Sequence, residues 1–214
     1  MAPLVPVAFA VAVGYVAGSL PWGLWLGRWF RGVDVRTVGS GNLGATNVYR
    51  ALGPALGIAT LVLDMLKGAV PVWLAGALPF AAQFPGGIEW CRLTVGFCAI
   101  AGHVWTMFAG WKGGKGVATT AGVVLALSPV AFLVSAAVFV ATVAISRYIS
   151  LGSILGAVTF AATLAVLSPR GLASPTFVFG ALAALLVVAR HKDNIARLMR
   201  GEERRFALRS GKPS

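Results

Sequence analysis

The segment Gly39-Ser40-Gly41-Asn42-Leu43-Gly44-Ala45-Thr46-Asn47-Val48-Tyr49-Arg50 separates two long apolar stretches. It combines three glycines, a serine, a threonine and two asparagines with a closing arginine. Glycine permits positive φ and lets backbone N–H groups approach a ligand closely. We therefore predict an anion site here, and phosphate is the anion that this arrangement suits best. The alternative is a plain glycine-rich turn between two helices, and the surrounding sequence decides between the two.

The composition around this segment is that of a membrane protein. The 214 residues are 58% hydrophobic and only 11% charged, with a mean hydropathy of +0.84. A soluble domain carries about a quarter charged residues. Residues 1–27 lack the basic start of a signal peptide and are predicted to be a retained span. We expect one integral membrane domain over 1–214, with 191–214 as a cytoplasmic basic tail.

Seven apolar segments predict an all-α protein with about seven transmembrane helices. They are Leu4–Gly27, Gly53–Phe80, Leu93–Gly110, Val117–Leu127, Val130–Ser146, Ile154–Leu167 and Phe177–Ala189, with residues 81–92 as a polar link. Gly14 and Gly18 form a G-x-x-x-G pair that favours close helix contact, and Pro21 predicts a kink. The fourth segment is short.

The charges orient these spans. With the N-terminus outside, 15 of the 18 Lys and Arg residues lie on the inner side, while Arg92 and Arg170 lie outside and Lys67 lies within a span. The positive-inside rule favours this topology, with a cytoplasmic C-terminus. The polar, glycine-rich junctions then face the cytoplasm.

The net charge of +12 indicates anionic partners, either lipid head groups or phosphorylated substrates. Nucleic acid is not expected, because the basic residues are scattered between spans. Within the spans, Asp64 and Lys67 are i,i+3 neighbours and should form an ion pair, whose role could be helix packing alone. His103 is either a packing residue or a functional one.

Several familiar motifs are excluded by their context. Residues 39–44 fit G-x-G-x-x-G, but a dinucleotide site needs a strand before it and a soluble helix after it. Residues 110–116 depart from a phosphate-binding loop in spacing and in the required Ser/Thr. The histidines His103 and His191 are far apart, Cys91 and Cys98 match no metal or redox motif, and no G-x-S-x-G occurs. No metal or cofactor is expected.

The inner junctions share a set of phosphate-binding side chains with few carboxylates: Ser40, Asn42, Thr46, Asn47, Arg50, Lys115, Ser150, Ser153, His191 and Asn194. Such a set suits the stabilisation of developing negative charge in a transfer reaction. His191 is the best candidate for a base. Residues 191–200 have the pattern of an amphipathic helix on the inner leaflet, and beyond Gly201 a solvated basic tail held by anionic lipid is the alternative.

Three runs in order carry a resemblance to a known family: Gly39–Arg50, Gly113–Thr119 and the His191-x-x-Asn194-Ile195-x-Arg197-Leu198 run. With Ser19-Leu20-Pro21, Asp64-x-x-Lys67-Gly68 and Gly102-His103, the chain resembles the bacterial acyl-phosphate:glycerol-3-phosphate acyltransferases. Thr106 departs from the family pattern, where proline is usual, which puts the helix shape near His103 in question.

The resemblance implies transfer of a fatty acyl group from acyl-phosphate to the 1-hydroxyl of glycerol-3-phosphate. The products would be lysophosphatidic acid and phosphate, at the inner membrane of a bacterium. Glycerol-3-phosphate would be held by Ser40, Arg50, Lys115, His191 and Asn194, with His191, Ser40 and Lys115 as the catalytic group. The acyl-phosphate side of the site would be lined by Asn42, Thr46, Asn47, Ser150 and Ser153. Gly41 and Gly114 would add further contacts to substrate.

Two other functions fit parts of the sequence. An anion transporter would also use glycine loops and basic residues, but the basic residues crowd one face and no inverted repeat is evident. A purely structural membrane protein leaves the polar junctions unexplained. The oligomeric state stays open, and membrane lipids are the other expected partner.

Overall fold

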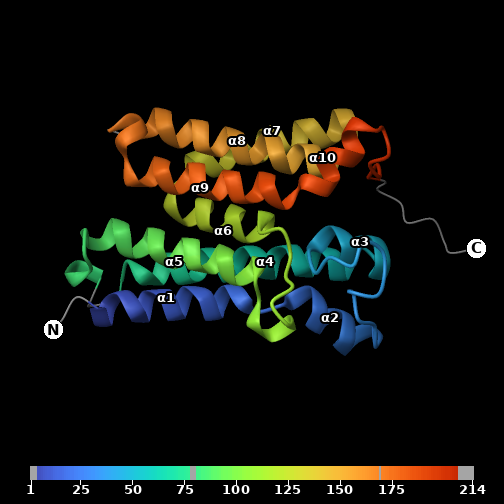
Figure 1. The fold of residues 1–214 in the computed structure, drawn as a ribbon, viewed down its shortest axis with the longest axis horizontal. Coiled ribbons are helices and arrows are strands. Elements are labelled where there is room, and N and C mark those ends of the chain that lie inside the picture. Colours follow the sequence, from blue (N-terminus) through green and yellow to red (C-terminus); the bar gives the residue numbers. More distant parts are fainter. Residues whose placement is uncertain (1–3, 78–80, 169, 207–214) are drawn as a thin grey trace, which may run out of the picture. The chain divides into compact units, whose positions relative to one another are not determined.

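The computed structural model describes residues 4–77, 81–168 and 170–206, and every regular element in these ranges is a helix (Figure 1). The α-helices are α1 Leu4–Ser19, α2 Trp22–Arg31, α3 Ala45–Leu52, α4 Pro54–Ala75, α5 Gly87–Val104, α6 Val117–Leu127, α7 Pro129–Ser146, α8 Ile149–Leu167, α9 Pro175–Arg190 and α10 Lys192–Met199. Short 3-10 turns cover Ala81–Gln83 (η1), Met107–Ala109 (η2) and Gly171–Ala173 (η3). The predicted all-α class is confirmed.

The chain forms two compact units, Met1–Pro129 and Val130–Ser214, and each is described by itself. In the first unit α1 lies along α5, and glycines bring the two backbones together. A Cβ at Gly14 would overlap the backbone of Val95, and a Cβ at Gly18 would overlap that of Ala99. The predicted close contact of the G-x-x-x-G pair is therefore confirmed.

The contact between α4 and α6 uses the same device. A Cβ at Gly68 would overlap the carbonyl of Thr119, and a Cβ at Gly122 would overlap that of Met65. Small residues permit such approach where dispersion contacts drive helix association. Helix α6 is thereby held directly on α4, which places the segment before α6 next to the middle of α4.

Several predicted helix boundaries are corrected. Helix α1 ends at Ser19 and α2 starts after Pro21, whereas α4 ends at Ala75, and the last predicted residues of that span, 78–80, lie outside the described residues. Helix α5 starts at Gly87 rather than Leu93. Its first turns tolerate Glu89 because an acid complements a helix N-terminus. They also tolerate Arg92 because its Nε donates to the carbonyl of Val72 at 3.2 Å.

In the second unit, α8 packs against α9, and Gly152 in α8 lies against Phe139 and Val143 of α7. Helix α8 starts at Ile149, five residues before the predicted Ile154. The serines predicted for a junction, Ser150 and Ser153, therefore stand in the first turns of a helix. Helix α9 starts at Pro175, and the hydroxyl of Ser174 caps it by accepting the N–H of Phe177 at 3.0 Å.

Within the described ranges, five stretches are long and apolar enough to cross a membrane: Leu4–Arg31, Pro54–Ala75, Gly87–Ala109, Pro129–Ser146 and Ile149–Leu167. Helices α9 and α10, bent by 59°, make a sixth if counted as one span. Helix α6 has 11 residues. That is about 16 Å of helix, against a hydrocarbon core of about 30 Å. The number seven and the orientation stay predictions.

Candidate active site

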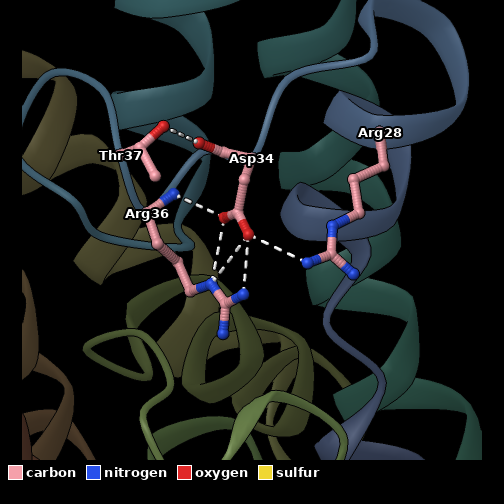
Figure 2. A network of polar contacts seen from close by, with 4 residues as sticks. All are labelled: Arg28, Asp34, Arg36 and Thr37. Carbon is pink, nitrogen blue, oxygen red and sulfur yellow. Dashed lines mark hydrogen bonds and ion pairs between the residues drawn. The ribbon is translucent and has the colours of Figure 1, made fainter.

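Asp34 organises the chain between α2 and the glycine-rich stretch (Figure 2). Its carboxylate accepts hydrogen bonds from the guanidinium groups of Arg28 at 2.9 Å and Arg36 at 2.6 Å, and from the backbone N–H of Arg36 at 3.0 Å. The hydroxyl of Thr37 donates to the Asp34 carbonyl at 2.9 Å. The side-chain bond from Arg36 is the main cause of a pKa of Asp34 far below its usual range. Arg28 and Arg36 therefore stabilise the conformation of this segment through Asp34.

Asn47 organises the glycine-rich stretch itself. Its buried side chain accepts the N–H of Ser40 at 2.8 Å and donates to the carbonyls of Val35 at 3.0 Å and Asn42 at 2.9 Å. An asparagine amide offers donors and an acceptor together, which suits a loop without regular backbone pairing. Gly39 has φ +64°, and a Cβ there would overlap Oδ1 of Asn47. Asn47, predicted to line a substrate, thus holds the loop's own backbone.

The backbone N–H groups of this stretch were predicted as donors to an anion, and three of them are engaged inside the protein. That of Ser40 bonds Asn47, that of Gly41 donates to the carbonyl of Val38 at 3.0 Å, and that of Gly44 donates to Oδ1 of Asn42 at 2.8 Å. An anion at this loop therefore depends more on side chains than the sequence suggested.

Three other polar side chains of the stretch belong to the predicted substrate-binding set. Ser40 is exposed in the loop, Thr46 lies in the first turn of α3, and the exposed Arg50 lies in its last turn. Thr46 and Arg50 are four residues apart, so they share one face of α3. A hydroxyl and a guanidinium on one face are a suitable pair for phosphate oxygens.

The second glycine cluster folds back onto the end of α5. The N–H of Gly113 donates to the carbonyl of Val104 and that of Gly114 to the carbonyl of His103, both at 3.1 Å. These bonds satisfy carbonyls that a helix end otherwise leaves without partners. The predicted substrate residue Gly114 therefore also caps a helix. Lys115 follows it, half-buried, two residues before the start of α6.

Thr106, where the sequence departs from the family pattern, stands between α5 and this cluster. Its hydroxyl donates to the carbonyl of Ser19 and accepts the N–H of Phe108 at 3.3 Å. Helix α5 ends at Val104, and Thr106 caps the short turn η2. The threonine thus ties this turn to the end of α1.

In the second unit, His191 lies between α9 and α10 with its ring buried. Its Nδ1 lies 2.7 Å from the carbonyl of Val187. A carbonyl only accepts, so Nδ1 carries the proton. In the neutral ring Nε2 is then the acceptor, which is the form needed to orient or deprotonate a hydroxyl.

Glu203, which the sequence analysis missed, joins two of the predicted site residues. Its Oε1 accepts from the hydroxyl of Ser150 at 2.7 Å and from Nδ2 of Asn194 at 2.6 Å, and its Oε2 accepts from Nε of Arg197 at 2.8 Å. Ser153 instead donates to the carbonyl of Ile149 at 2.9 Å. The one sequence signal for Glu203 was an acid within a basic tail.

The tail beyond Gly201 is docked as far as the structure describes it. The N–H of Phe206 donates to the carbonyl of Arg147 at 2.6 Å, and the guanidinium of Arg205 lies 5.8 Å from the ring centre of Tyr148. The alternative of a solvated tail is therefore contradicted at Glu203 and Phe206, whereas Gly201, Glu202, Arg204 and Arg205 are exposed. Arg209 and Lys212, counted in the charge analysis, lie outside the described residues. The helix predicted over 191–200 is confirmed as α10, which covers Lys192–Met199.

The predicted site residues thus fall into two sets, one in each unit. Ser40, Gly41, Asn42, Thr46, Asn47, Arg50, Gly114 and Lys115 belong to the first unit, and Ser150, Ser153, His191 and Asn194 belong to the second. Each set combines hydroxyl, amide and cationic or imidazole groups at helix ends. This chemistry fits a helical membrane protein that binds substrates with a phosphate group and a hydroxyl group.

The sequence is similar to those of known proteins over nearly its whole length. The profile of the glycerol-3-phosphate acyltransferase family matches residues 8–201. The glycerol-3-phosphate acyltransferase of Geobacter sulfurreducens is 48% identical over 196 residues, which cover 91% of this chain and 95% of that protein. That of Anaeromyxobacter sp. (strain Fw109-5) is 45% identical over 202 residues, covering 92% and 95%.

The fold is shared as well. The crystal structure of PlsY, an integral membrane glycerol 3-phosphate acyltransferase, in its glycerol 3-phosphate form has a TM-score of 0.83 at 38% identity, covering 94% of this chain and 96% of that one. Its lysophosphatidic acid form has a TM-score of 0.80 at 37% identity, covering 94% and 95%. The fold and these comparisons thus define an integral membrane acyltransferase. The chain belongs to the glycerol-3-phosphate acyltransferase family, which sets aside the transporter and structural alternatives.

Proposed function

We propose that the protein transfers a fatty acyl group from acyl-phosphate to the 1-hydroxyl of glycerol-3-phosphate, forming lysophosphatidic acid and inorganic phosphate. The solved relative is described in a glycerol 3-phosphate form and a lysophosphatidic acid form, which agree with this acceptor and product. The ordered motifs of the sequence support the choice of donor. Membrane phospholipid synthesis is the process that this reaction serves.

The hydrogen bond at Nδ1 of His191 is the observation that carries the donor assignment. Many thioester-dependent glycerolipid acyltransferases use a His-x4-Asp pair, in which a carboxylate strengthens the histidine base. Here Nδ1 is bonded to the carbonyl of Val187, and Ala196 stands at the Asp position. A weaker base is sufficient when the leaving group is good, as phosphate is in acyl-phosphate.

The reaction needs one bond made and one broken. The glycerol-3-phosphate hydroxyl oxygen attacks the acyl carbonyl carbon, the bond from that carbon to the phosphate oxygen breaks, and phosphate leaves with the electron pair. The hydroxyl proton passes to a phosphate oxygen. His191 accepts a hydrogen bond from the hydroxyl through Nε2 and orients it for attack.

The remaining roles follow from charge. Arg50 and Lys115 neutralise substrate phosphate, because charge-assisted bonds are stronger than neutral ones. Ser40 and Asn194 add neutral hydrogen bonds to glycerol-3-phosphate. Asn42, Thr46 and the serines of α8 belong to the acyl-phosphate side. Gly41 and Gly114 keep the chain close to the substrate without a side chain.

The donor is tested with purified protein and labelled glycerol-3-phosphate. Palmitoyl-phosphate, palmitoyl-CoA and palmitoyl-acyl carrier protein are offered separately, and lysophosphatidic acid and phosphate are measured. We expect turnover with the acyl-phosphate alone, with one phosphate released per lipid formed. Robust turnover with palmitoyl-CoA as the sole donor would overturn the assignment. A His191→Gln protein that binds glycerol-3-phosphate normally yet is wholly inactive would make His191 the base.

We further propose that the N-terminus is outside and the catalytic loops are cytoplasmic, on the inner membrane. Single cysteines at the exposed Gln83 and Glu202, in a protein with Cys91 and Cys98 replaced, test this. An impermeant thiol reagent added to cells with a permeabilised outer membrane should label the Gln83 position and spare the Glu202 position. Labelling of both positions contradicts an odd number of spans.

A further inference from the structure

A buried charged cluster in the first unit takes no part in the chemistry above. Nζ of Lys67 lies 2.8 Å from Oδ1 of Asp64 on α4, and the two side chains are 3% and 2% exposed. This confirms the predicted ion pair. Nδ1 of His103, near the end of α5, lies 3.7 Å from the same carboxylate oxygen. That distance is too long for a hydrogen bond, but it places the ring next to the carboxylate.

The cluster is joined to the segment that carries Lys115. The carbonyl of His103 accepts the N–H of Gly114, and a Cβ at Gly114 would overlap Nε2 of the His103 ring. A Cβ at Gly113 would overlap the His103 carbonyl. The imidazole of His103 therefore packs directly against the backbone of Gly114. A displaced ring would change the support of Gly114, the residue directly before Lys115.

The cluster also reaches the other end of the site in this unit. Nζ of Lys67 donates to the carbonyl of Leu20, at the break between α1 and α2, at 2.7 Å. A cavity of about 10 Å³, room for roughly one water, is lined by the cluster, by Leu43 of the glycine-rich stretch and by Gly114. Both glycine segments thus meet at the same three charged or titratable side chains.

We propose that Asp64, Lys67 and His103 are positioning residues for the glycerol-3-phosphate site. Asp64 orients the imidazole of His103, the imidazole supports Gly113 and Gly114, and these hold the ammonium of Lys115 at the substrate phosphate. Lys67 neutralises Asp64 and anchors the α1–α2 break. The inference rests on the substrate role proposed for Lys115, and its tests are separable from that role.

The first test replaces the ion pair by neutral side chains of similar shape, Asp64→Asn with Lys67→Met. Such replacements of a buried pair are often neutral for stability, whereas removing one partner is costly. If the pair only anchors the helices, the double variant keeps normal kinetics. We expect instead a KM for glycerol-3-phosphate raised by about tenfold or more, because small displacements of a binding group are expensive. The KM for the acyl donor should stay within about twofold. A double variant with an unchanged glycerol-3-phosphate KM would sink the proposal.

The second test is a double-mutant cycle between His103→Ala and Lys115→Ala. Residues that act through one another are not additive, whereas independent ones are. We expect His103→Ala to raise the glycerol-3-phosphate KM by about tenfold in the wild-type protein and to have little further effect beside Lys115→Ala. Equal effects in both backgrounds would overturn the inference. Normal kinetics for Lys115→Ala alone would instead overturn the proposed role of Lys115.

Thr60→Val is the matched control. Thr60 is fully buried on α4, one turn before Asp64, and its hydroxyl donates to the Leu56 carbonyl of its own helix at 2.8 Å. This variant should lower the unfolding temperature slightly and leave the glycerol-3-phosphate KM unchanged. A comparable rise in KM for Thr60→Val would show that any disturbance of α4 produces the effect, and would count against a positioning role.

Discussion

The glycine-rich stretch and the C-terminal tail are each organised by one buried side chain, but the reach of the two differs. Asn47 bonds backbone groups no more than 12 residues away. Glu203 joins Asn194 and Arg197 nearby to Ser150, 53 residues distant. The first region can close on its own sequence, whereas the second forms only when α8 and α10 are already packed. Damage to the first should therefore be local, and damage to the second should spread.

The largest effect that tests this contrast is expected from Asn47→Leu. The variant leaves the N–H of Ser40 and the carbonyls of Val35 and Asn42 without their partner, at a cost of about 3 kcal/mol or more. Because Ser40 then loses its position, kcat/KM should fall by roughly 100-fold or more. Thr37→Val, which removes a single bond at the surface, is the control and should keep near-normal activity. Steady-state kinetics with full activity in Asn47→Leu would refute the local role.

Arg50→Ala should come next. Loss of one charge-assisted bond to phosphate is worth about 1.5–3 kcal/mol, so kcat/KM should fall by roughly 10- to 150-fold. The unfolding temperature should hardly change, because the side chain is exposed. Arg31→Ala removes the same charge from the last turn of α2 and is the matched control. If both variants lose activity equally, net charge rather than the position of Arg50 explains the effect.

Glu203→Gln should have a smaller but wider effect. Its amide oxygen can still accept from Ser150 and Asn194, but its NH₂ group meets the donor of Arg197. We expect a loss of about 1–3 kcal/mol in the free energy of unfolding. Proteolysis should show whether α10 and the tail open before α8 does. A tail cleaved at the wild-type rate would contradict the spreading of damage from this site.

The pH dependence of stability gives a second test of the role of Glu203. Burial alone would raise the pKa of Glu203, but hydrogen bonds from Ser150, Asn194 and Arg197 outweigh it and lower the pKa below 4.5. A carboxyl with a lowered pKa stabilises the fold above its unfolded pKa and loses that contribution as pH falls through its folded pKa. Wild-type protein should thus lose stability below about pH 4.5 more steeply than Glu203→Gln. Asp34 adds the same slope to both proteins and cancels in the comparison.

The sequence predicted well those features that depend on residues close together in the chain. Hydrophobic runs located α6, α7 and α9 to within two residues, and the glycine pair at 14 and 18 predicted a real contact. The starts of α5 and α8 were missed because Glu89, Arg92, Ser150 and Ser153 look like loop residues. The helix terminus complements Glu89, backbone carbonyls accept from Arg92 and Ser153, and the carboxylate of Glu203 accepts from Ser150.

The site followed the same division. The motif residues were found, but not what several of them do. The bonds of Asn47 and the helix-capping role of Gly114 depend on geometry that residue types do not reveal. Glu203 was missed because its partners come from segments 9 and 53 residues away. The sequence left His103 as either a packing or a functional residue. Its contact with Gly114 in the structure indicates a positioning role.

The glycine-mediated helix contacts restrict how this enzyme can be made more robust by design. Replacing helical glycine with alanine commonly adds about 0.4–1 kcal/mol by limiting the unfolded chain. At Gly68 and Gly122 the added methyl would meet backbone, so such changes should push α4 and α6 apart. Gly156 of α8 differs, since its Cβ would lie 3.4 Å from the nearest atom, the carbonyl oxygen of Ser135. A thermostabilised variant for structural or inhibitor work should therefore start from Gly156→Ala, with a slightly higher unfolding temperature as its first readout.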